Sequence, residues 1–141
     1  MAYILGCCCV CLMDYLEVLS MTTKAKSYHD LIAWQKAISL AKEAHKYICK
    51  LPKEERFELG SQMRRAAVSI PSNIAEGQAR GSSKEFLNFL SIARGSNAEL
   101  QTQLILCVEF GYLTQDDITQ AVSLSNEVGR LINSLRRSIE N

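Results

Sequence analysis

Residues 64–77 read RRAAVSIPSNIAEG, a stretch with helical patterning at both ends and Pro71 in its middle. Apolar or small residues recur through it at intervals of three and four, the spacing of one face of an α-helix. They are Leu59, Met63, Ala66, Ile70, Ile74 and Gly77. The pattern predicts a helix that passes through Pro71 with a kink. Because proline frees the carbonyl four residues back, we expect Ser72 or Asn73 to satisfy that of Ala67.

The same spacing recurs in three other stretches. They are Leu31, Trp34, Ile38, Ala41, His45 and Ile48; then Phe86, Phe89, Ala93, Ser96, Leu100, Leu104 and Cys107; then Ile118, Ala121, Ser125, Val128, Ile132, Leu135 and Ile139. Pro52, Gly77 and Gly111 break the pattern, and Ser82 and Thr114 precede helical sequences that they can cap. Short connections make long neighbouring helices antiparallel. The sequence therefore predicts an all-α fold, an antiparallel up-down-up-down four-helix bundle.

The composition fits a single helical domain without a global charge. The chain has 141 residues, of which 48% are hydrophobic, and a formal net charge of +1. That content suffices for the core of one domain, and a charge near zero does not by itself attract nucleic acid or an anionic membrane. We expect a cytoplasmic protein without a membrane segment, which binds any charged partner through a local patch.

The first twenty residues, MAYILGCCCVCLMDYLEVLS, differ from the rest of the chain. They hold four of the six cysteines and lack the Lys or Arg that begins a secretory signal. We expect residues 1–26 to be a leader, translated from a start upstream of Met21, or a disordered extension, and residues 27–141 to form the bundle. No second ligand pair completes a metal site with the Cys7–Cys11 cluster, whose role stays open. Cys49 and Cys107 lie in apolar stripes, which predicts that they are buried.

A polar stripe follows a second face of the helix around the proline. Its members are Arg65, Ser69, Asn73, Glu76 and Arg80. A comparable stripe on the next helix holds Gly95, Glu99 and Thr102 or Gln103. If the two helices are neighbours, we expect Arg65 to face Glu99, and Glu76 to meet Arg94 or Arg80. Two interpretations are open: the stripe repairs the backbone around the proline, or it forms a polar interface between subunits.

Basic residues are in excess between residues 59 and 98. The candidate nucleic-acid contacts among them are Arg64, Arg80, Lys84 and Arg94. The loop at residues 80–84 leads into a helix N-terminus, which can bind phosphate through charge and free N–H groups. The alternative is that these cations form an ordinary solvated face.

The residues give little sign of catalysis. His29 precedes the first helix and His45 lies in its apolar stripe, with no nucleophile motif, phosphate loop or metal-ligand spacing around them. A lone histidine on an apolar face is usually a core residue. Glu76 and Glu99 each have a candidate arginine partner. We therefore expect no catalytic residue, no metal site and no cofactor.

Three stretches together resemble a known family. They are DLIAWQKAISLAKE at 30–43, RRAAVSIPSNIAEG at 64–77 and KEFLNFLSIARGSNAELQTQL at 84–104. They resemble the four-helix-bundle family encoded in intervening sequences of bacterial large-subunit ribosomal RNA genes. That family is similar in turn to the accessory variability protein of diversity-generating retroelements. The resemblance covers residues 28–139 and leaves out the first twenty.

The resemblance implies a ring-shaped homopentamer. Its retroelement branch implies a basic surface that binds nucleic acid and contacts a reverse transcriptase. By matching motif, the family's polar positions are Arg65, Ser69, Asn73, Glu76, Gly77, Arg80, Ser96 and Glu99. The chain departs from the family at Gln101, where an acidic residue is common, and at Gln78 and Ala79, which replace an aromatic-glycine step.

We therefore expect a non-enzymatic homo-oligomer, with Arg65, Ser69, Asn73, Glu76, Ser96 and Glu99 as its interface or polar network. Its expected partner is structured RNA or a nucleic-acid-processing protein such as a reverse transcriptase. The alternative is a structural or protein-interaction module that binds no nucleic acid.

Overall fold

The computed structural model describes residues 25–141, and every regular element in that part of the chain is helical. The elements are the 3-10 turn η1 (Tyr28–Asp30) and the α-helices α2 (Ile32–Lys50), α3 (Lys53–Phe57), α4 (Leu59–Ala79), α5 (Ser83–Glu109) and α6 (Gln115–Glu140). The Cys7–Cys11 cluster and residues 1–24 of the expected leader lie outside the described residues. Lys26, the last residue of the expected leader at 1–26, lies within the described residues and donates its backbone N–H to the Asp30 carboxylate at 3.1 Å.

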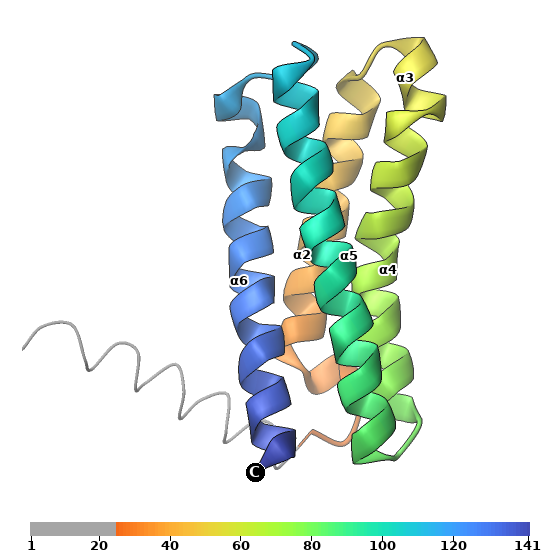
Figure 1. The fold of residues 1–141 in the computed structure, drawn as a ribbon, viewed down its shortest axis with the longest axis vertical. Coiled ribbons are helices and arrows are strands. Elements are labelled where there is room, and N and C mark those ends of the chain that lie inside the picture. Colours follow the sequence, from red (N-terminus) through yellow and green to blue (C-terminus); the bar gives the residue numbers. More distant parts are fainter. Residues whose placement is uncertain (1–24) are drawn as a thin grey trace, which may run out of the picture.

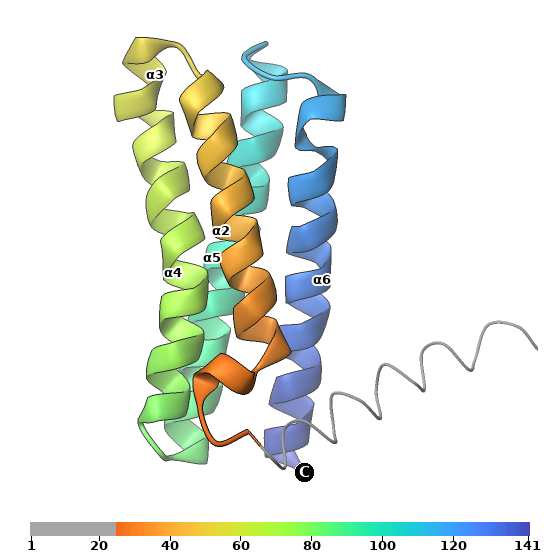
Figure 2. The same ribbon diagram turned by 180° about the vertical axis from the view of Figure 1, so that it is seen from behind.

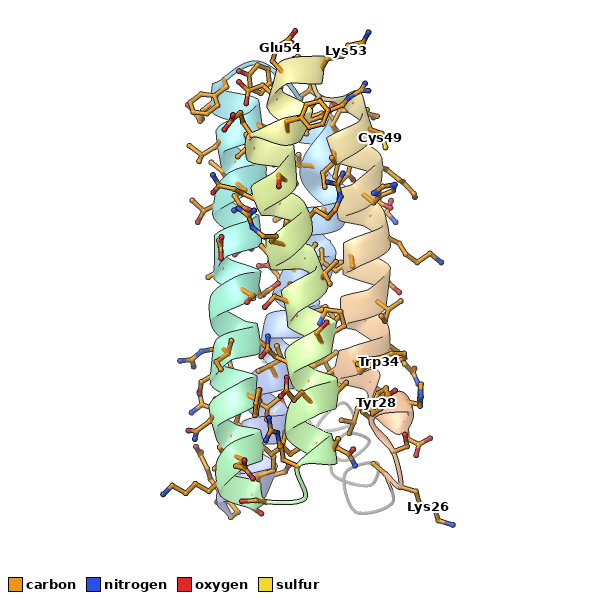
Figure 3. The ribbon with its side chains drawn as sticks, turned by 90° about the vertical axis from the view of Figure 1, so that its right-hand side faces the viewer. Lys26, Tyr28, Trp34, Cys49, Lys53 and Glu54 are labelled. Carbon is orange, nitrogen blue, oxygen red and sulfur yellow. The ribbon has the colours of Figure 1, made fainter. Side chains whose placement is uncertain are left out.

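The four long helices stand side by side as one bundle (Figures 1 and 2). Helix α2 packs against α4 and α6, and α5 packs against the same two helices. Trp34 lies toward one end of the bundle and Cys49 toward the other, near α3 (Figure 3). From α3 the chain returns along α4, runs back along α5 and returns again along α6 (Figure 1). The predicted all-α four-helix bundle is confirmed, and the long helices alternate in direction along the chain (Figures 1 and 2).

Helix α4 is continuous through Pro71, which is buried. The Ser72 hydroxyl donates to the Val68 carbonyl at 2.8 Å, and the Asn73 amide donates to the Ser69 carbonyl at 2.7 Å. The expectation that one of them satisfies the Ala67 carbonyl is therefore wrong. A short polar side chain in a helix bonds to the carbonyl four residues before it, and Pro71 itself occupies the position four residues after Ala67.

The end of α4 differs from the prediction at Gly77. The helix continues to Ala79, and Gly81, with a φ of 70°, takes the left-handed conformation that follows the helix end. Gly77 is buried against α5, where a β-carbon would lie 2.6 Å from Cβ of Phe89. Its lack of a side chain therefore serves helix packing and does not end the helix. Gly111, with a φ of 78°, follows the end of α5 as predicted.

The predicted caps are present at the starts of α5 and α6. The Ser82 hydroxyl accepts from the Glu85 N–H at 3.5 Å, and the Thr114 hydroxyl accepts from the Asp117 N–H at 3.1 Å. At Thr114 the bond is returned, since its own N–H donates to the Asp117 carboxylate at 2.9 Å. This reciprocal pair satisfies two backbone donors that a helix start leaves free.

The buried faces of α4, α5 and α6 follow the predicted stripes. Fully buried members include Met63, Ile70, Ile74, Ala93, Leu100, Leu104, Ala121, Ser125, Val128 and Ile132. Cys107 is buried as predicted, with its sulfur 3.6 Å from that of Met63. Burial raises the pKa of the Cys107 thiol to about 11.

In α2 the buried face lies beside the predicted one. The buried apolar residues of the helix are Ala33, Ala37, Leu40, Ala44, Tyr47 and Ile48. Trp34, Ile38 and Ala41 are only half-buried, and His45 is exposed. Cys49 is exposed as well, so the predictions that His45 and Cys49 are buried are wrong. Apolar residues cover so much of α2 that two neighbouring stripes both have helical spacing, and the alanine-rich stripe is the one that faces the bundle.

Candidate nucleic-acid interface and polar seam

Three of the predicted polar residues form a hydrogen-bonded chain between α4 and α5. The Ser69 and Ser96 hydroxyl oxygens lie 2.8 Å apart, and the Asn73 amide donates to the Ser69 hydroxyl at 2.8 Å. Ser96 is buried, while Ser69 and Asn73 are half-buried. The structure therefore brings Ser69, Asn73 and Ser96 together within one chain, where they join two neighbouring helices.

The expected pairing of Arg65 with Glu99 is not formed between these two described residues. The Arg65 guanidinium lies 3.4 Å from the Ser61 hydroxyl, and the Glu99 carboxylate accepts from the Gln103 amide at 3.1 Å. Both partners stand four residues away on the same helix, where a contact forms without orienting a second helix. Arg65 and Glu99 are both exposed.

Glu76 pairs with Arg80, one of its two predicted partners. Their side chains approach to 2.6 Å, and Arg80 also lies 3.9 Å from the Glu85 carboxylate. Its guanidinium carbon sits 5.4 Å from the centre of the Phe89 ring. The hydrogen bond with Glu76 raises the pKa of Arg80. Two carboxylates thus offset the charge of the loop that was a candidate phosphate site.

The four candidate nucleic-acid contacts lie in three different places. Arg64 projects from α4 beside α2. Arg80 and Lys84 flank the connection from α4 to α5, and Lys84 is exposed. Arg94 turns toward α6, where its guanidinium lies 3.5 Å from the Asn133 side-chain oxygen. Within a single chain these four side chains do not form one patch.

Arg94 instead joins two arginines of α6. Arg94, Arg136 and Arg137 line one hollow of about 280 Å³, together with Asn133 and Glu140. We call these three arginines the arginine cluster. Glu140 lies 3.6 Å from Arg136, so three positive charges share one carboxylate. The Nε atom of Arg136 is buried and has no hydrogen-bond acceptor within the described chain.

The arginine cluster was missed because its members are distant in sequence. Arg136 and Arg137 fall in the last turns of α6, where cations favour the negative end of the helix dipole, and each alone has that ordinary explanation. Only the antiparallel register of α5 and α6 brings Arg94 beside them. Asn133, one turn before the two arginines, contacts Arg94, but the sequence gives no sign of this contact.

Residues 25–141 contain no group of three His, Cys, Asp or Glu side chains placed to hold a metal ion. His29 lies in an aromatic group, with ring centres 4.1 Å from Tyr28 and 5.0 Å from Trp34. His45 Nε2 lies 3.9 Å from the Cys49 sulfur. None of the described helices combines the length and apolar character that a membrane span requires.

The family model described as 23S rRNA-intervening sequence protein matches residues 29–134. The chain belongs to this family. The matched segment begins within η1, holds α2, α3, α4 and α5 entire, and includes α6 as far as Ser134. Within the arginine cluster it includes Arg94 and ends just before Arg136 and Arg137. A comparison with curated proteins gives no match.

A solved structure has the same fold as this member of the family. It is the crystal structure, at 1.70 Å resolution, of a protein with unknown function from the S23 ribosomal protein family of Bacteroides thetaiotaomicron. The similarity covers 75% of this chain and 99% of that one, with 24% sequence identity and a TM-score of 0.68. At that identity the likeness establishes the fold alone.

Proposed function

We propose that this chain is a non-enzymatic homo-oligomer, a ring of five copies, which binds structured RNA in the cytoplasm through its arginine cluster. The observation that carries the RNA-binding part is the convergence of Arg94, Arg136 and Arg137 from two helices on one hollow. Membership in a family named for an rRNA intervening sequence supports the choice of RNA. The pentameric ring and a kinship with retroelement accessory proteins rest on the resemblance of the helical motifs.

The chemistry of the arginine cluster suits a phosphate backbone. A guanidinium presents planar N–H donors that match phosphate oxygens, and it stays charged at any physiological pH. Arg136 has a buried N–H without an acceptor, which a bound oxygen can supply. Such contacts recognise the backbone and shape of a folded RNA and do not read its bases.

A ring compensates for the near-zero charge of one chain. A single arginine cluster neutralises few phosphates, whereas a ring presents a cluster from every copy to the same RNA. Once one copy has bound the RNA, the contacts of the other copies are intramolecular, so the affinity rises with each cluster that binds. Each phosphate contact releases counterions, so we expect affinity to fall steeply with salt.

Binding of labelled total ribosomal RNA to the full chain tests this proposal. We expect Arg137→Gln to weaken binding and to reduce the salt slope by about one phosphate contact per copy. Lys53→Gln is the matched control, since it removes an exposed cation at the opposite end of the bundle (Figure 3). Unchanged affinity and slope in the triple variant Arg94→Gln, Arg136→Gln, Arg137→Gln would refute the role of the cluster.

The second candidate is a structural or protein-interaction module without nucleic-acid binding. Three exposed β-branched residues favour it: Val68, Ile92 and Ile105 are each about half accessible, at 54%, 51% and 51%. Such side chains on several helices suit contacts between proteins. A nucleic-acid-processing partner such as a reverse transcriptase is compatible with either candidate. A ring that binds no ribosomal RNA at low salt would favour the module.

A further inference from the structure

A groove with an apolar floor runs between α2 and α4. Its volume is about 570 Å³, and Ile38, Ala41, Ala67 and Val68 contribute to its lining. Val68 is 54% exposed although it lies in the middle of α4. Ile48 also lines the groove, and the distance along α2 from Ile38 to Ile48 is about 15 Å. We call this surface the α2–α4 groove.

The α2–α4 groove is lined by basic side chains as well as apolar ones. Lys42, Lys46 and Arg64 line it. Lys46 is paired with Glu43 at 2.7 Å, whereas Lys42 and Arg64 form no ion pair with any carboxylate of the described chain. Two uncompensated charges beside an apolar floor favour an occupant that is apolar along its centre and acidic at its edge.

A surface that is apolar along its centre and acidic at its edge lies on α5. Its members are Gly95, Ala98, Thr102, Ile105 and Glu109, all exposed and spaced at intervals of three, four, three and four. We call it the outward face of α5. The Thr102 hydroxyl donates to the Ala98 carbonyl at 2.9 Å, so it needs no external partner, and a β-carbon on Gly95 would meet nothing within 4 Å. Covering this face leaves few polar groups unsatisfied and lets another helix come close.

We propose that the α2–α4 groove of one copy receives the outward face of α5 of a second copy. This assignment rests on the self-association in the proposed function and identifies the surfaces that carry it. Ile105 packs onto the apolar floor beside Val68. Lys42 and Arg64 meet two carboxylates, that of Glu109 and that of Glu99, which follows Ala98. Neither carboxylate pairs with a cation of the described chain.

The two surfaces belong to different sides of the bundle, which determines the type of assembly. The groove lies at the seam of α2 and α4, and α5 packs against α4 and α6 (Figures 1 and 2). A contact between two different surfaces is heterologous, so every copy keeps one free groove and one free α5 face until the ring closes. Arg94 lies on α5 next to Gly95, so an arginine cluster borders each contact around the ring.

Two variants test the surfaces separately. Val68→Asp places a carboxylate on the groove floor, and Ile105→Asp places one on the outward face of α5. Both side chains are exposed in the single chain, so each variant should keep the helical circular dichroism of the wild type. We expect light scattering of the full chain to show that each variant alone has the mass of one copy. Ser123→Asp, an exposed change on α6, is the control and should keep the wild-type mass.

Mixing the two variants is the decisive step. Ile105→Asp retains an intact groove and Val68→Asp retains an intact α5 face, so the mixture should form a one-to-one dimer and grow no further. Wild-type mass in either variant, or a mixture that stays monomeric, overturns the assignment. Other outcomes test the proposed function separately from this assignment. A wild-type monomer refutes the assembly on which both rest, whereas a wild-type oligomer without affinity for ribosomal RNA refutes RNA binding and leaves the assignment intact.

Discussion

Gly77 lies where α4 crosses two aromatic side chains of α5. A β-carbon at this position would lie 2.6 Å from Cβ of Phe89 and 2.9 Å from Cδ2 of Phe86. Gly77→Ala should therefore force α4 and α5 apart and destabilise the fold by about 1–3 kcal/mol, measured by denaturant unfolding. Gly129→Ala on α6 is the control, because its β-carbon would meet Asn97 at an ordinary 3.5 Å. Equal stability of the two variants would show that α4 can shift without cost.

The sequence could not distinguish the two uses of glycine at the end of α4. Gly77 and Gly81 both follow an apolar stripe, and either one suits a helix end. The difference depends on Phe86 and Phe89, which belong to the next helix. The cap at Thr114 was predictable because its partner Asp117 is only three residues away.

Asp117 makes the start of α6 sensitive to acid. Hydrogen bonds from the N–H and hydroxyl of Thr114, and then the ion pair with Lys50 at 3.1 Å, lower the pKa of Asp117 to about 2. Because the pKa is lowered on folding, the stabilisation is present above the ordinary value of 3.8 and is lost as pH falls toward 2. Asp117→Asn should therefore melt at a lower temperature than the wild type at pH 7, and the gap should close between pH 4 and pH 2.

Asp116→Asn is the control for this pH dependence. Asp116 carries the same charge in the first turn of α6, but no hydrogen bond or ion pair within the described chain engages its side chain. A melting-temperature gap for Asp117→Asn that is constant from pH 7 to pH 2 would contradict the assigned role of its carboxylate.

Helix α2 shows how far periodicity alone determines a buried face. Its residues support two stripes at helical spacing, one with Trp34, Ile38 and Ala41 and one with Ala37 and Leu40. Hydrophobicity favours the first stripe, whereas the bundle buries the second because its alanines let neighbouring helices approach. The first stripe lines the α2–α4 groove through Ile38 and Ala41. Helices α4 and α6 bury most of their predicted stripes, and α5 buries its predicted stripe from Ala93 to Cys107. At the start of α5, Leu90 is buried although it lies outside that stripe.

Helices α5 and α6 are held in register by a buried polar pair. Ser125 donates its hydroxyl to the Asn97 side-chain oxygen at 2.9 Å, and the Asn97 amide donates to the Ser125 carbonyl at 3.0 Å. Ser125→Ala leaves the buried Asn97 oxygen without a donor and should cost about 1–3 kcal/mol in the free energy of unfolding. The exposed Ser123→Ala should change stability by less than about 0.5 kcal/mol. Because serine to alanine raises helix propensity at both positions, a Ser125→Ala variant that is as stable as Ser123→Ala would contradict the role of the hydrogen bonds with Asn97.

The folded molecule has two distinct surfaces, the α2–α4 groove and the arginine cluster, whose residues are scattered along the sequence. Apolar residues and cations line the α2–α4 groove, and the arginine cluster lies between the N-terminal half of α5 and the last turns of α6. Ser69 and Asn73 of the polar seam could be predicted because α4 carries them as a local polar stripe, whereas Ser96 falls in the apolar stripe of α5 and was expected to be a polar position only through the family resemblance. The arginine cluster depends on the register between two helices, which no local pattern contains. The pentamer and the RNA stay predictions at this scale.

Light scattering of the full 141-residue chain, with and without total ribosomal RNA, tests the central claim most directly. The measurement should be made at about 50 mM and about 200 mM salt, a range over which backbone-directed binding weakens strongly. We predict a particle of five copies that gains the mass of bound RNA at the lower salt and releases it at the higher. A particle with the mass of one copy, or an oligomer that gains no RNA mass at the lower salt, would contradict the claim.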